Sequence, residues 1–168
     1  KPTKELLGLV ASLVLRCDDC IAYHVDQCVT AGCTDQQIWE TFDVAAKHGQ
    51  FQVPAYHLTG WYDSLLNGTL ANFSGLRANA GTPRARANQR LIVGPWTHAR
   101  PNAGTNAIGD VSYGGDAGFD SEGLMRRWFQ HWLSDTGSAD FPGAPVRIFV
   151  MGENRWRDEQ EWPLARAR

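Results

Sequence analysis

Apolar residues recur at two different spacings along this chain, and the change of spacing divides it in two. In the first part they return every three to four positions, as Leu6, Val10 and Leu13 do, which is the period of an amphipathic helix. In the second part they form short continuous runs, which are typical of strands buried in a parallel sheet. The pattern therefore predicts a helical segment followed by an α/β segment, with the change at residues 47–50. The expected helices of the first part cover residues 4–15, 18–31 and 34–45.

Two apolar runs of the second part each lead to a polar residue of catalytic type. The run at residues 53–58 leads to Asp63, and the run at residues 90–93 leads to His98. A helical apolar stripe lies between them, so we expect a strand–helix–strand unit with parallel strands. Sites in open α/β sheets form at the carboxyl ends of the strands, which places the two side chains within hydrogen-bond reach. An acid followed by a histidine is the second half of the chain order of an α/β-hydrolase triad.

The remaining pattern predicts connectors and a second strand region. Residues 77–89 are polar, and residues 99–120 are rich in Gly and Asn, so both segments are expected to be loops. Residues 121–134 have the period of a helix whose tryptophan stripe packs into the core. Alternating apolar residues at 146–150 predict another strand.

Composition and charge exclude several classes of protein. The chain has 168 residues and a net charge of −2, so no basic surface for nucleic acid is expected. No apolar run is long enough to span a bilayer, and the N-terminal residues lack a signal-peptide cleavage site. We therefore expect a cytoplasmic protein that binds neither nucleic acid nor membranes. Nothing in the sequence calls for a cofactor.

All four cysteines lie within the first 33 residues, at positions 17, 20, 28 and 33. Cys17 and Cys20 open the second expected helix, and a helix N-terminus lowers the pKa of a thiol. His24, one turn after Cys20, can accept a thiol proton. Zinc is an alternative, but the set from Cys17 to Cys28 spans about 16 Å on one straight helix. Zinc bonds of about 2.0–2.3 Å do not bridge that length, so no metal site is predicted.

Three blocks of the second part together resemble the CocE/NonD hydrolases, cocaine-esterase-like relatives of the X-Pro dipeptidyl-peptidases. They are Gln52–Asp63 with its Gly-Trp-Tyr-Asp ending, Gly94–His98, and Arg127–Leu133. The resemblance covers residues 47–168, and it implies that Asp63 is the triad acid and His98 the triad base. It also implies a partial α/β-hydrolase sheet over residues 47–144 and the start of a C-terminal β jelly-roll over residues 145–168. No Gly-x-Ser-x-Gly occurs in the chain, so the nucleophile and the upstream catalytic half of the family have no counterpart.

The first part resembles the AhpD-like, carboxymuconolactone decarboxylase family. The matching residues are Glu5 and the spacing Cys17-x-x-Cys20-x-x-x-His24, and the resemblance covers residues 1–46. It implies that Cys17 attacks a peroxide and Cys20 resolves the product as a disulfide. Glu5 and His24 would move protons in the same reaction.

Three functional hypotheses follow. The first is an acyl hydrolase acting on a small ester or amide through a Ser-His-Asp triad whose serine is absent from this chain. The second is a thiol-dependent peroxidase or disulfide oxidoreductase using Cys17 and Cys20. The third is a fusion or fragment without catalysis. A second chain that supplies the missing core is one expected partner, beside the small-molecule substrate.

Overall fold

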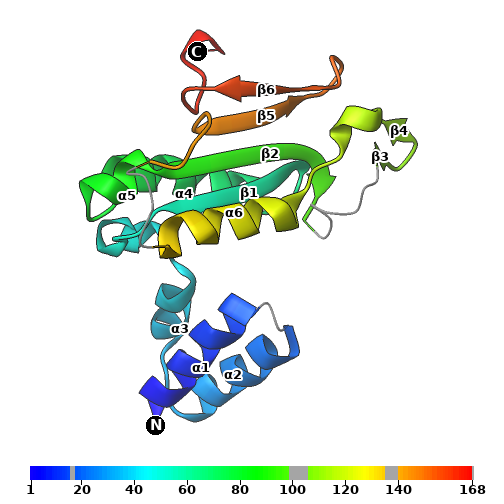
Figure 1. The fold of residues 1–168 in the computed structure, drawn as a ribbon. Coiled ribbons are helices and arrows are strands. Elements are labelled where there is room, and N and C mark those ends of the chain that lie inside the picture. The colour runs from blue at the N-terminus through cyan, green and yellow to red at the C-terminus, as the bar shows by residue number, and fades with distance from the viewer. Residues whose placement is uncertain (16–17, 99–105, 135–139, 168) are drawn as a thin grey trace. The chain divides into compact units, whose positions relative to one another are not determined.

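The chain folds into two compact units. The computed structural model describes residues 1–15, 18–98, 106–134 and 140–167 (Figure 1). Contacts within the chain divide it into Lys1–Lys47 and His48–Arg168, and each unit is described by itself below. No helix among the described residues has the length and apolar character needed to cross a membrane.

The first unit consists of three helices, α1 (Pro2–Leu15), α2 (Asp18–Thr30) and α3 (Asp35–Phe42). Helix α2 ends before Gly32, whose positive φ of 81° suits a residue without a side chain. Helix α3 begins with a capping box, in which Thr34 accepts the N–H of Gln37 at 3.2 Å and Gln37 accepts the N–H of Thr34 at 2.9 Å. The three predicted helices are confirmed, the third ending three residues earlier than expected. Leu9, Cys28 and Ile38 form a small core of their own.

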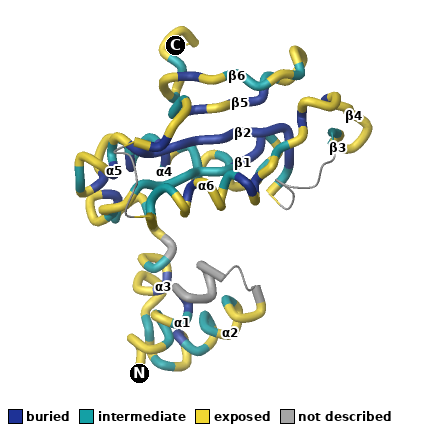
Figure 2. The backbone as a smooth tube through the Cα atoms, viewed as in Figure 1, coloured by how far each residue is buried: buried dark blue, intermediate teal, exposed yellow. Residues whose placement is uncertain are grey.

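A four-stranded sheet forms the centre of the second unit, in the order β1 (Ala55–Tyr62), β2 (Gln89–Thr97), β5 (Val146–Val150) and β6 (Arg155–Glu159). Strands β1, β2 and β5 are parallel, and β6 runs antiparallel to β5. Strand β2 has a neighbour on both sides and is buried over eight of its nine residues (Figure 2). This double burial explains why its sequence is a continuous apolar run rather than an alternating one. A separate hairpin joins β3 (Ala107–Ile108) to β4 (Val111–Ser112).

Two helices cover opposite faces of this sheet. Helix α4 (Leu66–Asn79) connects β1 to β2, and α6 (Ser121–Leu133) precedes β5 (Figure 1). On β1, His57 contacts Phe73 of α4, while its neighbour Tyr56 contacts Trp128 of α6. Consecutive strand residues point to opposite faces, so the two helices lie on different sides. The main core is on the α4 side and comprises Phe73, Leu91, Val93, Val146 and Ile148.

The structure differs from the expectations in two connectors and in the last strand region. The polar segment 77–89 contains a short helix, α5 (Pro83–Ala87), which Thr82 caps by accepting the N–H of Ala85 at 3.1 Å. The described part of the segment 99–120 contains β3, β4 and a 3₁₀ turn at Gly115–Ala117. Strands β5 and β6 extend the same sheet as β1 and β2. The predicted start of a jelly-roll is therefore not confirmed. The predicted α/β class is confirmed, as a mixed α/β fold with a mostly parallel sheet.

Glu159, at the end of β6, is held by two arginines. Its carboxylate accepts hydrogen bonds from Arg157 at 2.6 Å and from Arg166 at 2.8 Å, and it is 8% exposed. The bond from Arg166 is the largest influence on the carboxyl group and, together with Arg157, outweighs the opposing effect of burial. The pKa of Glu159 is lowered to about 2.

We expect Glu159→Gln to lower the melting temperature at neutral pH by roughly 5 °C. Because its pKa is lowered, the ionised carboxylate of Glu159 stabilises the fold at any pH above the ordinary pKa of 4.5. This contribution disappears as the pH falls toward about 2. The difference between wild type and variant should therefore shrink across that range. Thermal unfolding followed by circular dichroism at several pH values measures it, with the exposed Glu122→Gln as the control. A constant difference at every pH would contradict the assigned pairing.

Candidate active site

The ends of two neighbouring parallel strands place Asp63 beside His98. Tyr62 closes β1 and pairs with Thr97, which closes β2, so the residue that follows each lies at the same edge of the sheet. The Asp63 N–H then donates to the Gly60 carbonyl at 3.0 Å, which turns the chain out of the strand. The geometry is that of a site at the carboxyl ends of parallel strands.

The two side chains are hydrogen-bonded. His98 Nδ1 lies 3.1 Å from Asp63 Oδ1 and 3.3 Å from Oδ2, so the expected contact is present. The Asp63 side chain is only 6% exposed, whereas that of His98 is 51% exposed. An inner carboxylate thus holds an imidazole whose outer part faces solvent.

Two further donors fix the Asp63 carboxylate. The Leu65 N–H donates to Oδ1 at 2.8 Å, and the buried Thr59 hydroxyl donates to Oδ2 at 3.1 Å. Burial works to raise the pKa of Asp63, but the bonds from Leu65, His98 and Thr59 outweigh it, and the net pKa is below the ordinary value. The carboxylate is therefore ionised at neutral pH. Thr59 and Leu65 orient it, in addition to the imidazole of His98. Ser64, which follows Asp63, does not cap the next helix, since α4 begins after Leu65.

Two glycines allow the strand ends to come together. The register of β1 against β2 shifts between Gly60 and Tyr62. A Cβ on Gly60 would lie 2.0 Å from the Trp96 carbonyl oxygen, and a Cβ on Gly94 would lie 2.2 Å from the Trp96 ring. Trp96, which lies two residues before His98, therefore packs over both glycines.

A pair of tyrosines joins the strand end to the β3–β4 region. The hydroxyls of Tyr62 and Tyr113 are hydrogen-bonded, and Tyr113 is 3% exposed. Burial, with the bond to Tyr62, raises the pKa of Tyr113 to about 12. Sequence reasoning missed the tyrosine pair, because its members are 51 residues apart and no motif joins them. It also missed Thr59, which reaches Asp63 only where the end of the strand turns back.

No described serine is placed as a nucleophile. Ser74 lies in α4, where its hydroxyl contacts the Trp162 carbonyl at 3.5 Å, and Ser112 lies in β4. None of the serines within the described ranges is hydrogen-bonded to His98. Among the described residues, the site thus pairs a carboxylate with an imidazole and places no serine beside them.

The first unit carries the second set of predicted residues. Glu5 Oε2 lies 3.2 Å from His24 Nδ1, and a Cβ on Gly8 would meet the His24 ring at 2.3 Å, so the glycine makes room for this contact between α1 and α2. Cys20 is disulfide-bonded. Cys17 lies outside the described residues, and its predicted exposure and pairing are not tested. Among the described side chains no cluster suited to a metal ion is present.

We expect Cys28 to be the slowest thiol to alkylate after reduction of the folded protein. Cys28 is fully buried, and burial together with the neighbouring Cys33 raises the pKa of its thiol. The thiolate is the reactive form, and burial also hinders access of the reagent, so iodoacetamide at neutral pH should modify Cys33 about tenfold faster than Cys28. Peptide mass spectrometry over a time course measures both rates, with the urea-unfolded chain as the reference. Equal rates in the folded protein would show that this core opens easily.

Two solved structures share the fold of most of this chain. The chain superposes on an α-amino acid ester hydrolase with a TM-score of 0.58 and 22% identity, over 92% of this chain and 24% of the other. It superposes on an aminopeptidase from a marine sediment Thaumarchaeota archaeon with a TM-score of 0.59 and 22% identity, over 74% and 20%. At this identity the likeness concerns the fold alone.

Curated relatives make the similarity more specific. The chain is 32% identical over 148 residues to the cocaine esterase of Rhodococcus sp. (strain MB1 Bresler), and 30% identical over 111 residues to a putative serine esterase of Mycobacterium bovis. These matches cover 86% and 64% of this chain but 24% and 15% of the relatives. Residues 1–52 match the carboxymuconolactone decarboxylase family. The chain thus combines similarity to ester hydrolases of the cocaine-esterase type with an AhpD-like N-terminal segment.

Proposed function

We propose that the second unit provides the acid and the base of an acyl hydrolase that cleaves small esters or amides. The observation that carries this proposal is the Asp63–His98 hydrogen bond of 3.1 Å at the ends of two parallel strands. The similarity to esterases supports the same chemistry.

The geometry assigns a distinct task to each side chain. With Nδ1–H donating to Asp63, the other ring nitrogen, Nε2, is the unprotonated one and can take a proton from a nucleophile. Asp63 fixes this tautomer and stabilises the imidazolium formed during attack. Thr59 and Leu65 hold the carboxylate from the other side, so they act as positioning residues.

The nucleophile is proposed to come from polypeptide outside these 168 residues. A serine on a strained strand-to-helix turn would present its hydroxyl to His98 Nε2, which is the exposed part of the imidazole. A second chain or a further segment of a longer protein can meet this requirement equally well. The substrate is proposed to be a small ester or amide, whose oxyanion donors would come from the same source as the serine.

We expect the purified chain to remain unlabelled by a serine-reactive fluorophosphonate probe and to hydrolyse p-nitrophenyl acetate only at the background rate. Removing the nucleophile of a triad costs on the order of 10⁶ in kcat, and no described serine reaches His98. Gel fluorescence and absorbance assays measure both quantities, with heat-unfolded protein as the background. Stoichiometric labelling that disappears in His98→Ala would mean that the chain contains its own nucleophile.

A second candidate function is thiol-based peroxide reduction by the first unit, and the Glu5–His24 contact favours it. The Cys17 thiolate would attack the peroxide O–O bond, releasing an alcohol or water and leaving a sulfenic acid. The Cys20 thiol would then displace water to form the disulfide. Consumption of cumene hydroperoxide by the pre-reduced chain tests this function, with Cys20→Ser and Cys33→Ser compared. Equal single-turnover rates of disulfide formation in wild type and Cys20→Ser would contradict it.

A further inference from the structure

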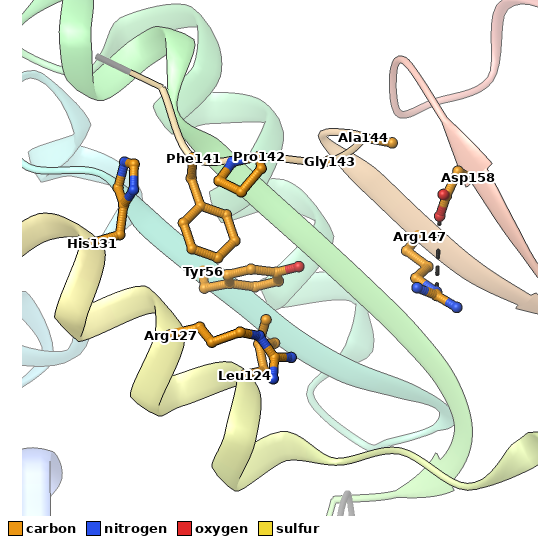
Figure 3. A pocket seen from close by; sticks show the side chains of 10 residues that line it. All are labelled: Tyr56, Leu124, Arg127, His131, Phe141, Pro142, Gly143, Ala144, Arg147 and Asp158. Atoms are coloured by element: carbon orange, nitrogen blue, oxygen red, sulfur yellow. Dashed lines mark ion pairs between the residues drawn. The ribbon is translucent and has the colours of Figure 1, made fainter. Parts of the chain in front are cut away.

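A cavity of about 320 Å³ lies on the α6 side of the sheet in the second unit. Helix α6 supplies one wall and the segment 141–147 the other (Figure 3). Its volume is within the range of about 300–1,000 Å³ that is typical of small-molecule sites. The side chains that matter for its chemistry are Tyr56, Arg127, His131, Phe141, Arg147 and Asp158.

One part of the cavity is aromatic and firmly packed. The rings of Tyr56 and Phe141 meet edge to face, with centroids 6.2 Å apart. Trp128 supports both rings from α6, at 5.2 Å from Tyr56 and 4.9 Å from Phe141. Phe141 is held further by its carbonyl, which accepts a hydrogen bond from the Arg90 guanidinium at 2.6 Å. The aromatic surface is therefore preformed and suits a flat apolar ligand.

The other part of the cavity is cationic. Arg127 projects from α6 and Arg147 from β5 (Figure 3), while Asp158 is the one acid lining it, so the formal charge of the lining is +1. Arg147 and Asp158 are 3.8 Å apart, with side chains 50% and 61% exposed, and an exposed pair of this kind is weak. Arg127 makes no ion pair with any residue that the structure describes. Two guanidinium groups are thus available to an anion.

Two polar groups of the lining also lack hydrogen-bond partners among the residues that the structure describes. The Tyr56 hydroxyl points to the side of the cavity where Arg147 lies (Figure 3), and it makes no hydrogen bond within the described ranges. Burial raises the pKa of Tyr56 despite the nearby arginines, so the hydroxyl remains a donor at neutral pH. His131 Nε2 is buried and has no hydrogen-bond partner among the described atoms. An unpaired buried polar atom is costly unless a ligand or water satisfies it.

We propose that this cavity is a binding site for a small aromatic carboxylate, with the ring on Tyr56 and Phe141 and the carboxylate between Arg127 and Arg147. Guanidinium groups favour planar, charge-assisted binding of a carboxylate. Tyr56 lies six residues before Tyr62, the last residue of the extended strand that leads to Asp63, which is about 20 Å at roughly 3.3 Å per residue. The site is therefore separate from the acid–base pair and does not depend on the proposed hydrolysis.

The probe for this proposal is 2-naphthoate, with 2-naphthalenemethanol as its neutral counterpart. Both are titrated into the full chain and followed by ¹H–¹⁵N correlation spectra. We expect saturable binding of naphthoate with shifts confined to α6, the N-terminal half of β1 and residues 140–147, and at least fivefold weaker binding of the alcohol. Naphthoate binding should also weaken with added salt, because the arginines are exposed.

Matched variants locate the charge requirement. Arg127→Gln should weaken naphthoate binding by about tenfold, which corresponds to 1.4 kcal/mol, and should leave binding of the alcohol unchanged. Arg126→Gln, next to it on α6 but outside the cavity lining, should behave as wild type. Unchanged amide spectra away from the site establish that each variant is folded. Three results would each overturn the proposal: no saturable naphthoate binding, equal binding of acid and alcohol, or equal losses in the two arginine variants.

Discussion

A chimaera carrying residues 48–168 in place of the matching part of the Rhodococcus cocaine esterase is expected to hydrolyse esters and to lose about 10⁶-fold in kcat on His98→Ala. In this chimaera the nucleophile would have to come from the esterase part, and this chain would supply the Asp63–His98 pair seen at 3.1 Å. Members of a triad act as a unit, so loss of the base removes nearly the whole contribution of the triad. Asp63→Asn should cost about 10⁴, because the imidazole is then held in the wrong tautomer.

Steady-state hydrolysis of p-nitrophenyl esters measures these losses. Ser64→Ala is the matched control, since Ser64 adjoins Asp63, is exposed, and its hydroxyl makes no hydrogen bond with a described residue. It should leave kcat within about twofold. Circular dichroism and the melting temperature of each chimaera establish folding before rates are compared. A folded, active chimaera whose rate is insensitive to His98→Ala would contradict the assignment of the base.

Phe73→Ala is expected to lower the free energy of unfolding of the second unit by about 3–5 kcal/mol. The ring is fully buried against Leu91, Val93, Val146 and Ile148, and its removal leaves a cavity between α4 and the sheet. Four neighbours from two rigid strands cannot collapse into that space, so the loss should lie in the upper part of the range. Most tryptophans belong to this unit, so urea unfolding followed by tryptophan fluorescence measures the effect.

The control for this prediction is Phe129→Ala, the same chemical change at a ring that is 55% exposed on α6. Its effect should stay within about 0.5 kcal/mol. A large loss for both variants would indicate that the surface of α6 is covered in solution. A small loss for both would mean that α4 is not packed on the sheet as observed.

Local signals predicted that Asp63 and His98 lie together, because each follows an apolar run that forms a strand. Period-3.6 apolar spacing likewise predicted α1–α3 and α6, and continuous apolar runs predicted β1 and β2. Each of these signals lies within a single helix or a single strand, so it can be recognised from neighbouring residues alone. The catalytic roles of Asp63 and His98, and all expectations for Cys17, remain predictions.

Some features escaped prediction because they depend on how the chain bends or on contacts between distant segments, and one escaped because its local signal is short. Thr59 reaches Asp63 only because the strand end bends back, and Tyr62 meets Tyr113 across 51 residues. Helix α5 forms in a polar stretch because Thr82 and Pro83 provide a cap and a first turn, a short signal that the polar composition obscured. The cationic cavity was equally hidden, since its arginines lie on α6 and β5 and are unremarkable in either stretch alone.

Gly60 and Gly94 have a consequence for how this sequence can vary over evolutionary time. Any side chain at Gly60 would meet the Trp96 backbone, and any at Gly94 would meet the Trp96 ring. The displaced Trp96 lies two residues before His98, and Gly94 adjoins Val93 of the core around Phe73. Substitutions at these glycines would therefore move His98 relative to Asp63 and also disturb the packing beside it. The need to keep both the strand ends and this core in place would hold the two positions free of side chains.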